Sequence, residues 1–367
     1  MKRLAGLLAL LLFVFPSLVW AMSVAFINPG KSDEAYWLTA TKAMEAAAKD
    51  LDIRFEVFYA ERQHPRVFEL ARQIVARPVA DRPDYVVITN DYATGPELLR
   101  LFDAAGIKTF LAYSGISEPV ERAVTGQPRE HFKGWLGSLE PRAQEAGYLT
   151  AKALIQQGRR AQAQAADGRL HFLAISGDRS TPASNRRGEG MRRAVAEAGD
   201  VVLEQEIFSG WNRAKAVEQS EWLFQRYPLA RLVWAGNDQM AFGAMQVWEK
   251  RGGKPGKDAW FSAVNASPEA MAALKSGRLA ALAGGHFICG AWALVMLYDY
   301  DHGRDFAEAE GVEVNQSMFT LFSQKDADRF MVRFGQLHFD QVNFRRFSKA
   351  LNPKLKRYDF NFRQLLD

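Results

Sequence analysis

The chain has very little cysteine. Cys289 is the single cysteine among 367 residues, and it lies in the apolar run Phe287–Trp292. One thiol cannot form an intrachain disulfide, so we expect stability to come from packing, with Cys289 as a buried structural thiol. The six histidines are scattered, and none has a second histidine or cysteine at the spacing of a zinc site. The sequence therefore predicts no metal site.

Enzyme signatures are also missing. The chain has no G-x-G-x-x-G after a strand, no phosphate-binding loop with Gly-Lys-Ser/Thr and no G-x-S-x-G turn. Its formal net charge is only +5, and the basic residues are dispersed, which argues against a nucleic-acid partner. We therefore expect no catalytic residue and no cofactor. A secreted α/β enzyme is the most remote alternative.

Long hydrophobic runs are scarce, apart from one at the N-terminus. Lys2 and Arg3 precede an apolar run from Leu4 to Phe15, and Val19 and Ala21 supply small residues at the two positions that a signal peptidase reads. The run is shorter than the roughly 20 residues of a membrane span. We expect residues 1–21 to be a signal peptide cleaved near Ala21, followed by an exported, soluble protein. A retained N-terminal anchor is the alternative.

From Ser23 onward, short apolar runs alternate with longer amphipathic segments, which predicts parallel sheets covered by helices on both faces. In the first half, strands are expected at Ser23–Asn28, Arg54–Ala60, Asp84–Thr89, Lys108–Tyr113 and Trp135–Leu139, with helices at Glu34–Lys49, Val67–Ala76, Pro96–Ala105 and Ala143–Gln156. A polar loop over residues 158–168 separates this series from a second one. There, strands are expected at Leu170–Ser176, Val201–Phe208, Leu232–Ala235, Trp260–Asn265 and Leu279–Ala283, with helices at Arg186–Glu197, Arg213–Tyr227, Gln239–Lys250, Glu269–Lys275 and Ala291–Tyr300.

Two such series predict an α/β fold with two doubly wound parallel-sheet lobes joined by a multi-strand hinge. We expect an N-terminal lobe over residues 22–134, to which about 286–311 returns. A C-terminal lobe should cover residues 135–285, with about 312–323 returning to it. Hinge strands should cross near residues 133–135, 284–286 and 303–312.

Residues 324–367 form a C-terminal extension with basic and aromatic segments at 344–347 and 354–358. One interpretation is a tail that lies over a lobe with its charges in water. The other is a docking surface for a membrane partner or anionic headgroups.

Polar or aromatic residues recur just after the expected strands. The carboxyl ends of parallel strands meet at one edge of a sheet, so two lobes would present these residues to a common cleft. Amides suit an uncharged polyhydroxylated ligand because each offers donors and an acceptor. Asparagine is also a common turn and cap residue, which is the alternative for each position. The residues concerned are Asn28, Asn90, Tyr113, Asn237 and Asn265.

Aromatic residues form a second candidate set. Tyr36 and Trp37 open the first helix, and Trp211 lies in a loop before the helix at Arg213. Flat rings of this kind could hold a sugar or a similar small molecule between them. Trp222, Trp248 and Trp292 lie within helical patterns, and we expect them in the core.

Three motifs carry a resemblance to a known family: Val24–Pro29, Gly177–Met191 and Ala235–Ala244. Over about residues 23–323 the chain resembles the type I periplasmic solute-binding proteins, the ribose- and galactose-type binding components of bacterial ABC transporters. The resemblance implies a monomer in the periplasm that closes over a small-molecule solute and delivers it to an inner-membrane ABC permease. It also implies, residue by residue, the cleft positions Asn28, Tyr113, Asn185, Trp211, Asn237 and Asn265.

Departures from the family pattern concern the ligand. Monosaccharide binders of this family usually carry acids where this chain has Tyr113 and Asn265, and an arginine where it has Asn185. We therefore expect a more neutral cleft, with space opened by Gly284 and Gly285 near His286, and a larger, less polar or aromatic-containing ligand. The alternative function is a ligand-sensing periplasmic receptor that docks on a membrane sensor kinase or cyclase.

Overall fold

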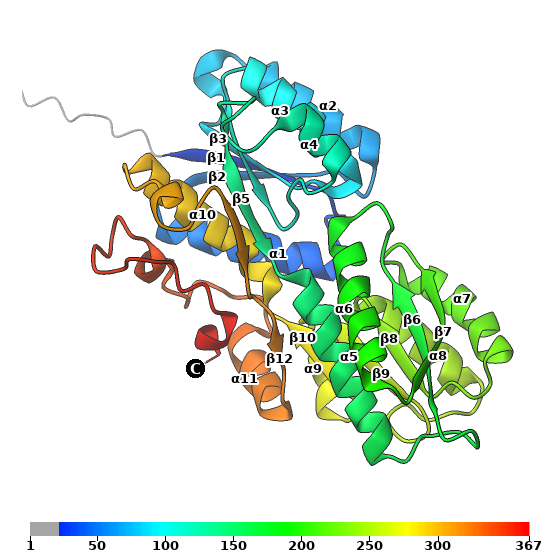
Figure 1. Cartoon of the computed structure of the whole chain (residues 1–367). Coiled ribbons are helices and arrows are strands. Elements are labelled where there is room, and N and C mark those ends of the chain that lie inside the picture. Colours follow the sequence, from blue (N-terminus) through cyan, green and yellow to red (C-terminus); the bar gives the residue numbers. More distant parts are fainter. Residues whose placement is uncertain (1–21, 367) are drawn as a thin grey trace, which may run out of the picture.

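The computed structural model describes residues 22–366 and contains two six-stranded sheets (Figure 1). The expected signal peptide, residues 1–21, lies outside the described residues. All strand pairs are parallel except β10 with β12, which are antiparallel. The first sheet has the order β11 (Glu313–Gln316), β5 (Trp135–Pro141), β4 (Lys108–Ala112), β3 (Tyr85–Ile88), β1 (Ser23–Asn28) and β2 (Arg54–Tyr59). The second has the order β12 (Thr320–Leu321), β10 (Ala281–Gly284), β9 (Trp260–Val264), β8 (Leu232–Ala235), β6 (Leu170–Ser176) and β7 (Val201–Phe208).

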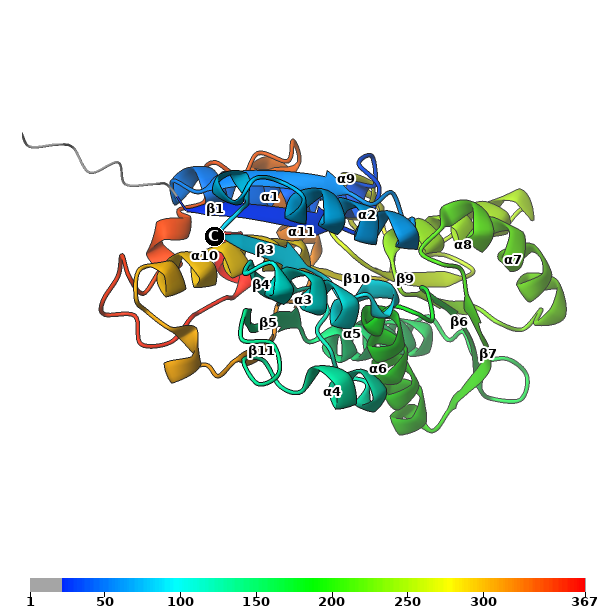
Figure 2. The ribbon, with the colours of Figure 1, turned by 90° about the horizontal axis from the view of Figure 1, so that it is seen from above.

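Helices cover the sheets because the central strands are apolar on both faces. Every residue of β1 and of β6 is buried, as expected for parallel strands that connecting helices enclose. The first lobe carries α1 (Ala35–Asp50), α2 (His64–Val75), α3 (Gly95–Ala104), α4 (Pro119–Thr125) and α10 (Cys289–Asp301). The second carries α5 (Ala143–Arg160), α6 (Pro182–Ala198), α7 (Arg213–Arg226), α8 (Asp238–Lys250), α9 (Pro268–Lys275) and α11 (Gln324–Phe334). Seen from above, the two lobes lie side by side (Figure 2).

The chain crosses between the lobes after β5, after β10 and between β11 and β12. Two expected boundaries therefore change. Strand β5 does not begin the second lobe, because it pairs with β4 in the first sheet. The single strand expected within 312–323 is two strands, since β11 pairs with β5 while β12 pairs with β10. An apolar run shows that a strand is buried but not which sheet it joins.

The core includes most of the expected apolar positions. Cys289 and Trp292 are fully buried on α10, which packs against α1. Trp222 does not belong to the core, contrary to expectation: it lies on the outer face of α7 and is 56% exposed. Within residues 22–366, no helix combines the length and apolar character needed to cross a membrane. In the same range, no cluster of three or more His, Cys, Asp or Glu residues is arranged to hold a metal ion.

The C-terminal extension begins with α11 in the second lobe, and the rest of it lies mainly over the first lobe beside α10, with its last turn returning close to α11 (Figure 1). Its phenylalanines point inward, and Phe344, Phe347 and Phe360 are buried. Lys354 and Lys356 are exposed to solvent. This arrangement agrees with a tail laid over a lobe with its charges in water.

Candidate ligand-binding cleft

A cavity lies between the two lobes at the carboxyl edges of both sheets. It encloses about 610 Å³ of space free of protein atoms, part of which is open to solvent. Of the residues expected in the cleft, the cavity is lined by Tyr36, Trp37, Tyr113, Trp211, Asn237, Asn265 and His286.

Aromatic rings form much of the wall. The ring of His286 is stacked between Tyr36 and Phe319, with centroid distances of 4.9 Å and 4.5 Å. Trp37 packs edge-on against Tyr36 and Tyr113. These rings come from α1, from the end of β4 and from two of the crossings between the lobes, so ring packing connects the first lobe to the hinge.

Three lining residues adopt a backbone conformation that favours glycine. The φ angles of Tyr113, Trp211 and Asn265 are 69°, 64° and 118°. A non-glycine residue there costs of order 1–3 kcal/mol and persists where its surroundings fix it, often at functional sites. Each follows a strand, and the unusual turn directs its side chain into the cavity. Trp211 lies directly on the backbone of Gly177, where a Cβ would come within 2.3 Å of the indole.

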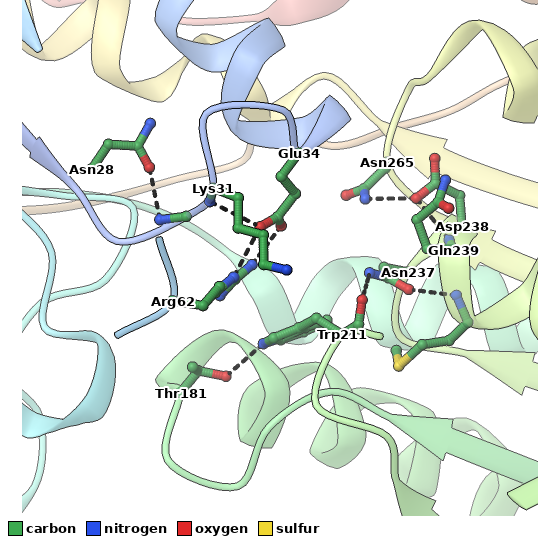
Figure 3. Close-up of polar contacts among 12 residues, drawn as sticks. Asn28, Lys31, Glu34, Arg62, Thr181, Trp211, Asn237, Asp238, Gln239 and Asn265 are labelled. Atoms are coloured by element: carbon green, nitrogen blue, oxygen red, sulfur yellow. Dashed lines mark hydrogen bonds and ion pairs between the residues drawn. The ribbon is translucent and has the colours of Figure 1, made fainter. Parts of the chain in front are cut away.

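The first lobe contributes charged groups to this cavity. Arg62 donates two hydrogen bonds to Glu34, at 2.9 Å and 2.5 Å, in a bidentate ion pair (Figure 3). Asp91, in the turn that follows β3, is buried and accepts a hydrogen bond from the Ser114 hydroxyl at 2.9 Å. Burial raises the pKa of Asp91, and the charge of Arg62 and the Ser114 hydrogen bond offset this only in part.

The second lobe contributes Arg187 from α6. Arg187 is 5% exposed and donates to the Gly236 carbonyl oxygen at 2.7 Å and to His286 Nε2 at 2.9 Å. Burial lowers its pKa to about 10, so the guanidinium is charged at neutral pH. An arginine only donates, so Nε2 of His286 is the acceptor and its proton lies on Nδ1. Burial, followed by the charge of Arg187, lowers the pKa of His286 and keeps the ring neutral.

Three buried N–H donors on the cavity wall have no hydrogen-bond partner within the described chain. They are Nε of Arg187, Nδ1 of His286 and Nε1 of Trp37. Buried polar groups are nearly always paired, so unpaired donors around one cavity indicate where a bound molecule would supply acceptors.

The expected asparagines have mixed outcomes. The Asn237 side chain lines the cavity but also caps α8, accepting from the Met240 backbone N–H at 2.8 Å (Figure 3). Asn265 lines it and donates to the buried Asp238 at 2.9 Å.

Asn28, Asn90 and Asn185 lie outside the cavity, contrary to expectation. Asn28 accepts from the Gly30 N–H and donates to Thr41, whereas Asn90 accepts from the Gly95 N–H. Asn185 is exposed on α6 and donates to a backbone carbonyl of its own loop. Asn28 and Asn90 thus bind local backbone, as turn and cap residues do.

The expectation of a more neutral, more open cleft is wrong. Glu34, Arg62, Asp91 and Arg187 all line the cavity. The space expected over the hinge glycines is filled, because a Cβ on Gly284 would meet the Asn265 carbonyl and one on Gly285 would meet the Phe362 ring. Arg187 was missed because α6 begins at Pro182, earlier than expected. From its second turn, a long side chain that points towards the helix N-terminus can reach the cleft.

The lobes also meet directly at the rim of the cavity. The backbone N–H of Tyr92, in the loop after β3, donates to the Ser180 carbonyl in the loop after β6 at 3.0 Å. This bond joins the first lobe to the second, so the structure has the two rims in contact.

Two lobes, three crossings and a cavity between the carboxyl edges define a type I periplasmic solute-binding protein. The chain matches the periplasmic binding protein domain over residues 24–304, and it belongs to this family. A periplasmic sugar-binding protein from Pseudomonas fluorescens is similar at 37% identity and a TM-score of 0.85. That likeness covers 94% of this chain and all of that one.

Two further similarities are more limited. The arabinose-transporter binding protein from Shewanella sp. ANA-3, bound to L-arabinofuranose, has a TM-score of 0.67 at 19% identity. The similar region covers 87% of this chain and 96% of that protein, and the likeness shows that the two proteins share a fold. The ribose import binding protein of Salmonella typhimurium is 30% identical over 109 residues, which are 30% of this chain and only 36% of that protein.

Proposed function

We propose that the protein binds a small, uncharged, polyhydroxylated solute such as a sugar and delivers it to an inner-membrane ABC importer. The observation that carries this proposal is the pair of opposite charges on one cavity: Asp91 from the first lobe and Arg187 from the second. A hydroxyl group can donate to a carboxylate and accept from a guanidinium at once. A polyol would therefore join the two lobes.

The charge balance favours an uncharged ligand. Glu34 and Arg62 neutralise each other as an ion pair, Asp91 balances Arg187, and His286 is neutral. A charged solute would leave a net charge in a largely buried site, which is costly. The rings of Trp37 and Trp211 offer apolar faces that suit the C–H faces of a sugar.

The relatives support the same class of solute. The similar Pseudomonas fluorescens structure is described as a periplasmic sugar-binding protein, and the matching Salmonella protein as a ribose import binding protein. By analogy we place this protein in the periplasm as a monomer, with residues 1–21 as its signal peptide. Its proposed solute contacts are Tyr36, Trp37, Asp91, Tyr113, Arg187, Trp211, Asn237, Asn265 and His286.

Hinge closure is the proposed mechanism. A solute that contacts both rims binds the closed state more tightly than the open state. It shifts the equilibrium towards the closed state by the difference between these two binding free energies. In the closed state, contacts such as that between Tyr92 and Ser180 create a surface that spans both lobes. An importer could recognise the loaded protein by this surface.

A thermal-shift screen tests the ligand class. The panel should contain aldopentoses and aldohexoses in pyranose and furanose forms, sugar acids, amino acids and aromatic glycosides. A solute at 100 times its Kd stabilises the folded state by about 2.7 kcal/mol and raises Tm. We expect neutral sugars to raise Tm and titration calorimetry to confirm one-to-one binding. A response confined to amino acids or apolar aromatics would contradict the proposal.

A further inference from the structure

The last residues of the chain reach the back of the cleft from outside the family domain. We call residues 340–366 the C-terminal strap; they lie beyond the 24–304 family match. The strap leaves α11 of the second lobe and returns to the first lobe at the end of α1. There, Asp50 accepts the backbone N–H groups of Phe344 and Arg345 at 2.7 Å and 3.1 Å.

The strap is anchored on α10 by a buried carboxylate. Asp299 is fully buried and accepts from the backbone N–H groups of Lys349 and Ala350 at 2.7 Å and 3.0 Å. The hydroxyls of Ser348 and Tyr358 also donate to it. A carboxylate with four donors fixes the path of the strap along this helix.

After this anchor the strap turns inward and places Phe362 at the hinge. Phe362 is 1% exposed, and its ring centroid lies 5.2 Å from that of Phe287 and 6.3 Å from that of Phe330 on α11. It packs directly on the bare backbone of Gly285, where a Cβ would lie 2.5 Å from its ring. Gly285 has a φ of 107°, a conformation that glycine adopts easily and also leaves easily.

Phe362 therefore contacts both chain neighbours of His286. Gly285 precedes His286 and Phe287 follows it, at the crossing after β10. The His286 ring itself is stacked between Tyr36 and Phe319, and its Nε2 accepts from Arg187. One short turn thus contacts the strap through Gly285 and Phe287 and lines the cavity through His286.

We propose that Phe362 is a positioning residue for the cleft, which holds the Gly285 turn so that His286 faces Arg187 and keeps its free Nδ1–H on the cavity. The inference rests on the proposed function only in taking this cavity as the binding site. Without the ring, a void opens beside Gly285, whose nearest side-chain neighbour at the Cα is Phe362. In a variant that lacks the Phe362 ring, the His286 ring is expected to adopt more than one orientation and to become accessible to water.

A proton titration followed by NMR tests this without any sugar. The imidazole signals of the six histidines are recorded between about pH 8 and pH 5, across their ordinary pKa of about 6.5. The variant His286→Gln identifies the signal that disappears. In the unaltered protein we expect His286 to stay neutral throughout, with a single Nδ1–H tautomer.

In Phe362→Ala we expect both tautomers to appear and the pKa of His286 to rise towards its ordinary value. The matched control is Phe360→Ala, which removes an equally buried ring of the same strap. That ring stacks on Trp292 at 5.0 Å instead of on the hinge. Both variants should lose comparable stability, but Phe360→Ala should leave the His286 titration unchanged.

Two results would overturn the inference. One is a folded Phe362→Ala protein whose His286 keeps the unaltered tautomer and titration. The other is an equal change in Phe360→Ala, which would mean that general loosening of the strap is responsible. If Phe362→Ala does not fold, Phe362→Leu and Phe362→Val form a graded series, and the pKa of His286 should rise with the volume removed. Because protons are the probe, a failed sugar screen would leave this result intact.

Discussion

Arg187 is a buried cation whose side-chain hydrogen bonds go to a carbonyl and an imidazole. Its guanidinium also lies over the rings of Trp211 and Phe319, at 5.3 Å and 5.8 Å from their centroids. These contacts hold the group still but leave Nε without a partner. A pre-oriented donor costs a ligand little ordering entropy, so Arg187 should contribute strongly to affinity.

We predict that Arg187→Met raises the Kd for the best sugar of the screen by roughly 10- to 100-fold. A hydrogen bond to a charged group is worth about 1.5–3 kcal/mol, which corresponds to that range. Titration calorimetry measures the change. The control is Arg186→Met, which alters the adjacent residue outside the cavity and should change Kd less than threefold. Equal effects of the two variants would argue against the assignment.

Two histidines should give opposite pH dependences of stability. The pKa of His286 is lowered in the folded protein. As the pH falls, His286 is therefore protonated in the unfolded chain before it is protonated in the folded protein. The stability from its neutral ring is complete above about pH 6.5 and is lost as the pH falls below this value. The pKa of His171 is raised: burial lowers it, but hydrogen bonds with Glu204 and Asp167 more than compensate. Its contribution is present below about pH 6.5 and is lost as the pH rises through the raised pKa.

Melting temperatures between about pH 8 and pH 5 should therefore separate the two residues. We expect His286→Gln to reduce the loss of Tm on acidification and His171→Gln to increase it. Parallel curves for the unaltered protein and His286→Gln would show that this ring does not titrate differently in the folded and unfolded states.

Individual cleft residues could be predicted where polar or aromatic residues follow a strand, or where aromatic residues open a helix, as Tyr36 and Trp37 do. Tyr113 and Asn265 come directly after β4 and β9, and Trp211 lies in the loop after β7, so the fold brings them together at the carboxyl edges of the sheets.

Arg187 was missed because charged residues near helix starts are common on solvated surfaces. Asp91 follows the same strand as Asn90, but the amide was preferred because it suits an uncharged ligand. Asn28 and Asn90 were predicted to contact the ligand but do not line the cavity. Their amides accept hydrogen bonds from nearby backbone N–H groups, which is an equally common role for an asparagine at a strand end.

At the scale of elements, helix α10 carries the anchor of the strap. Replacing Asp299 by Ala would leave four buried donors without an acceptor. We expect a loss of at least about 3 kcal/mol in the free energy of unfolding, because each buried donor left without an acceptor costs about 1–3 kcal/mol. Urea unfolding measures the loss.

The control is Asp301→Ala on the same helix. Asp301 is exposed and accepts a hydrogen bond from Tyr85 at 2.7 Å. Its removal should cost only about 1 kcal/mol. If the two variants were equally stable, the strap would not depend on Asp299.

Many element boundaries were predictable from the sequence, although α6 begins earlier than expected and α4 was not predicted. Sheet membership was not predictable. Helix α8 was expected at Gln239–Lys250 and begins at Asp238, because the Asn237 cap and the apolar period are local signals. Which lobe receives β5 or β11 depends on pairing between strands far apart in the chain. Local periodicity carries no information about that pairing.

At the scale of the whole molecule, the single thiol makes lobe motion measurable. Burial raises the pKa of Cys289, so this residue should not react with dyes. Cysteines introduced at Val79 on the first lobe and Leu229 on the second are exposed positions for a fluorescent pair. We predict that the best sugar of the screen changes energy transfer between them, and that Arg187→Met requires more sugar for the same change. Constant transfer at saturating sugar would contradict hinge closure.

The position of Phe362 near the end of the chain has a consequence for biosynthesis. Ribosomes make Gly285 and His286 some 75 residues before the ring that supports them. During synthesis both lobes can therefore gain their sheets while the pocket between them is still unfinished. Folding intermediates that lack the final segment should be poor at capturing solute, and a bulky fusion placed after Leu366 would disturb the same late step.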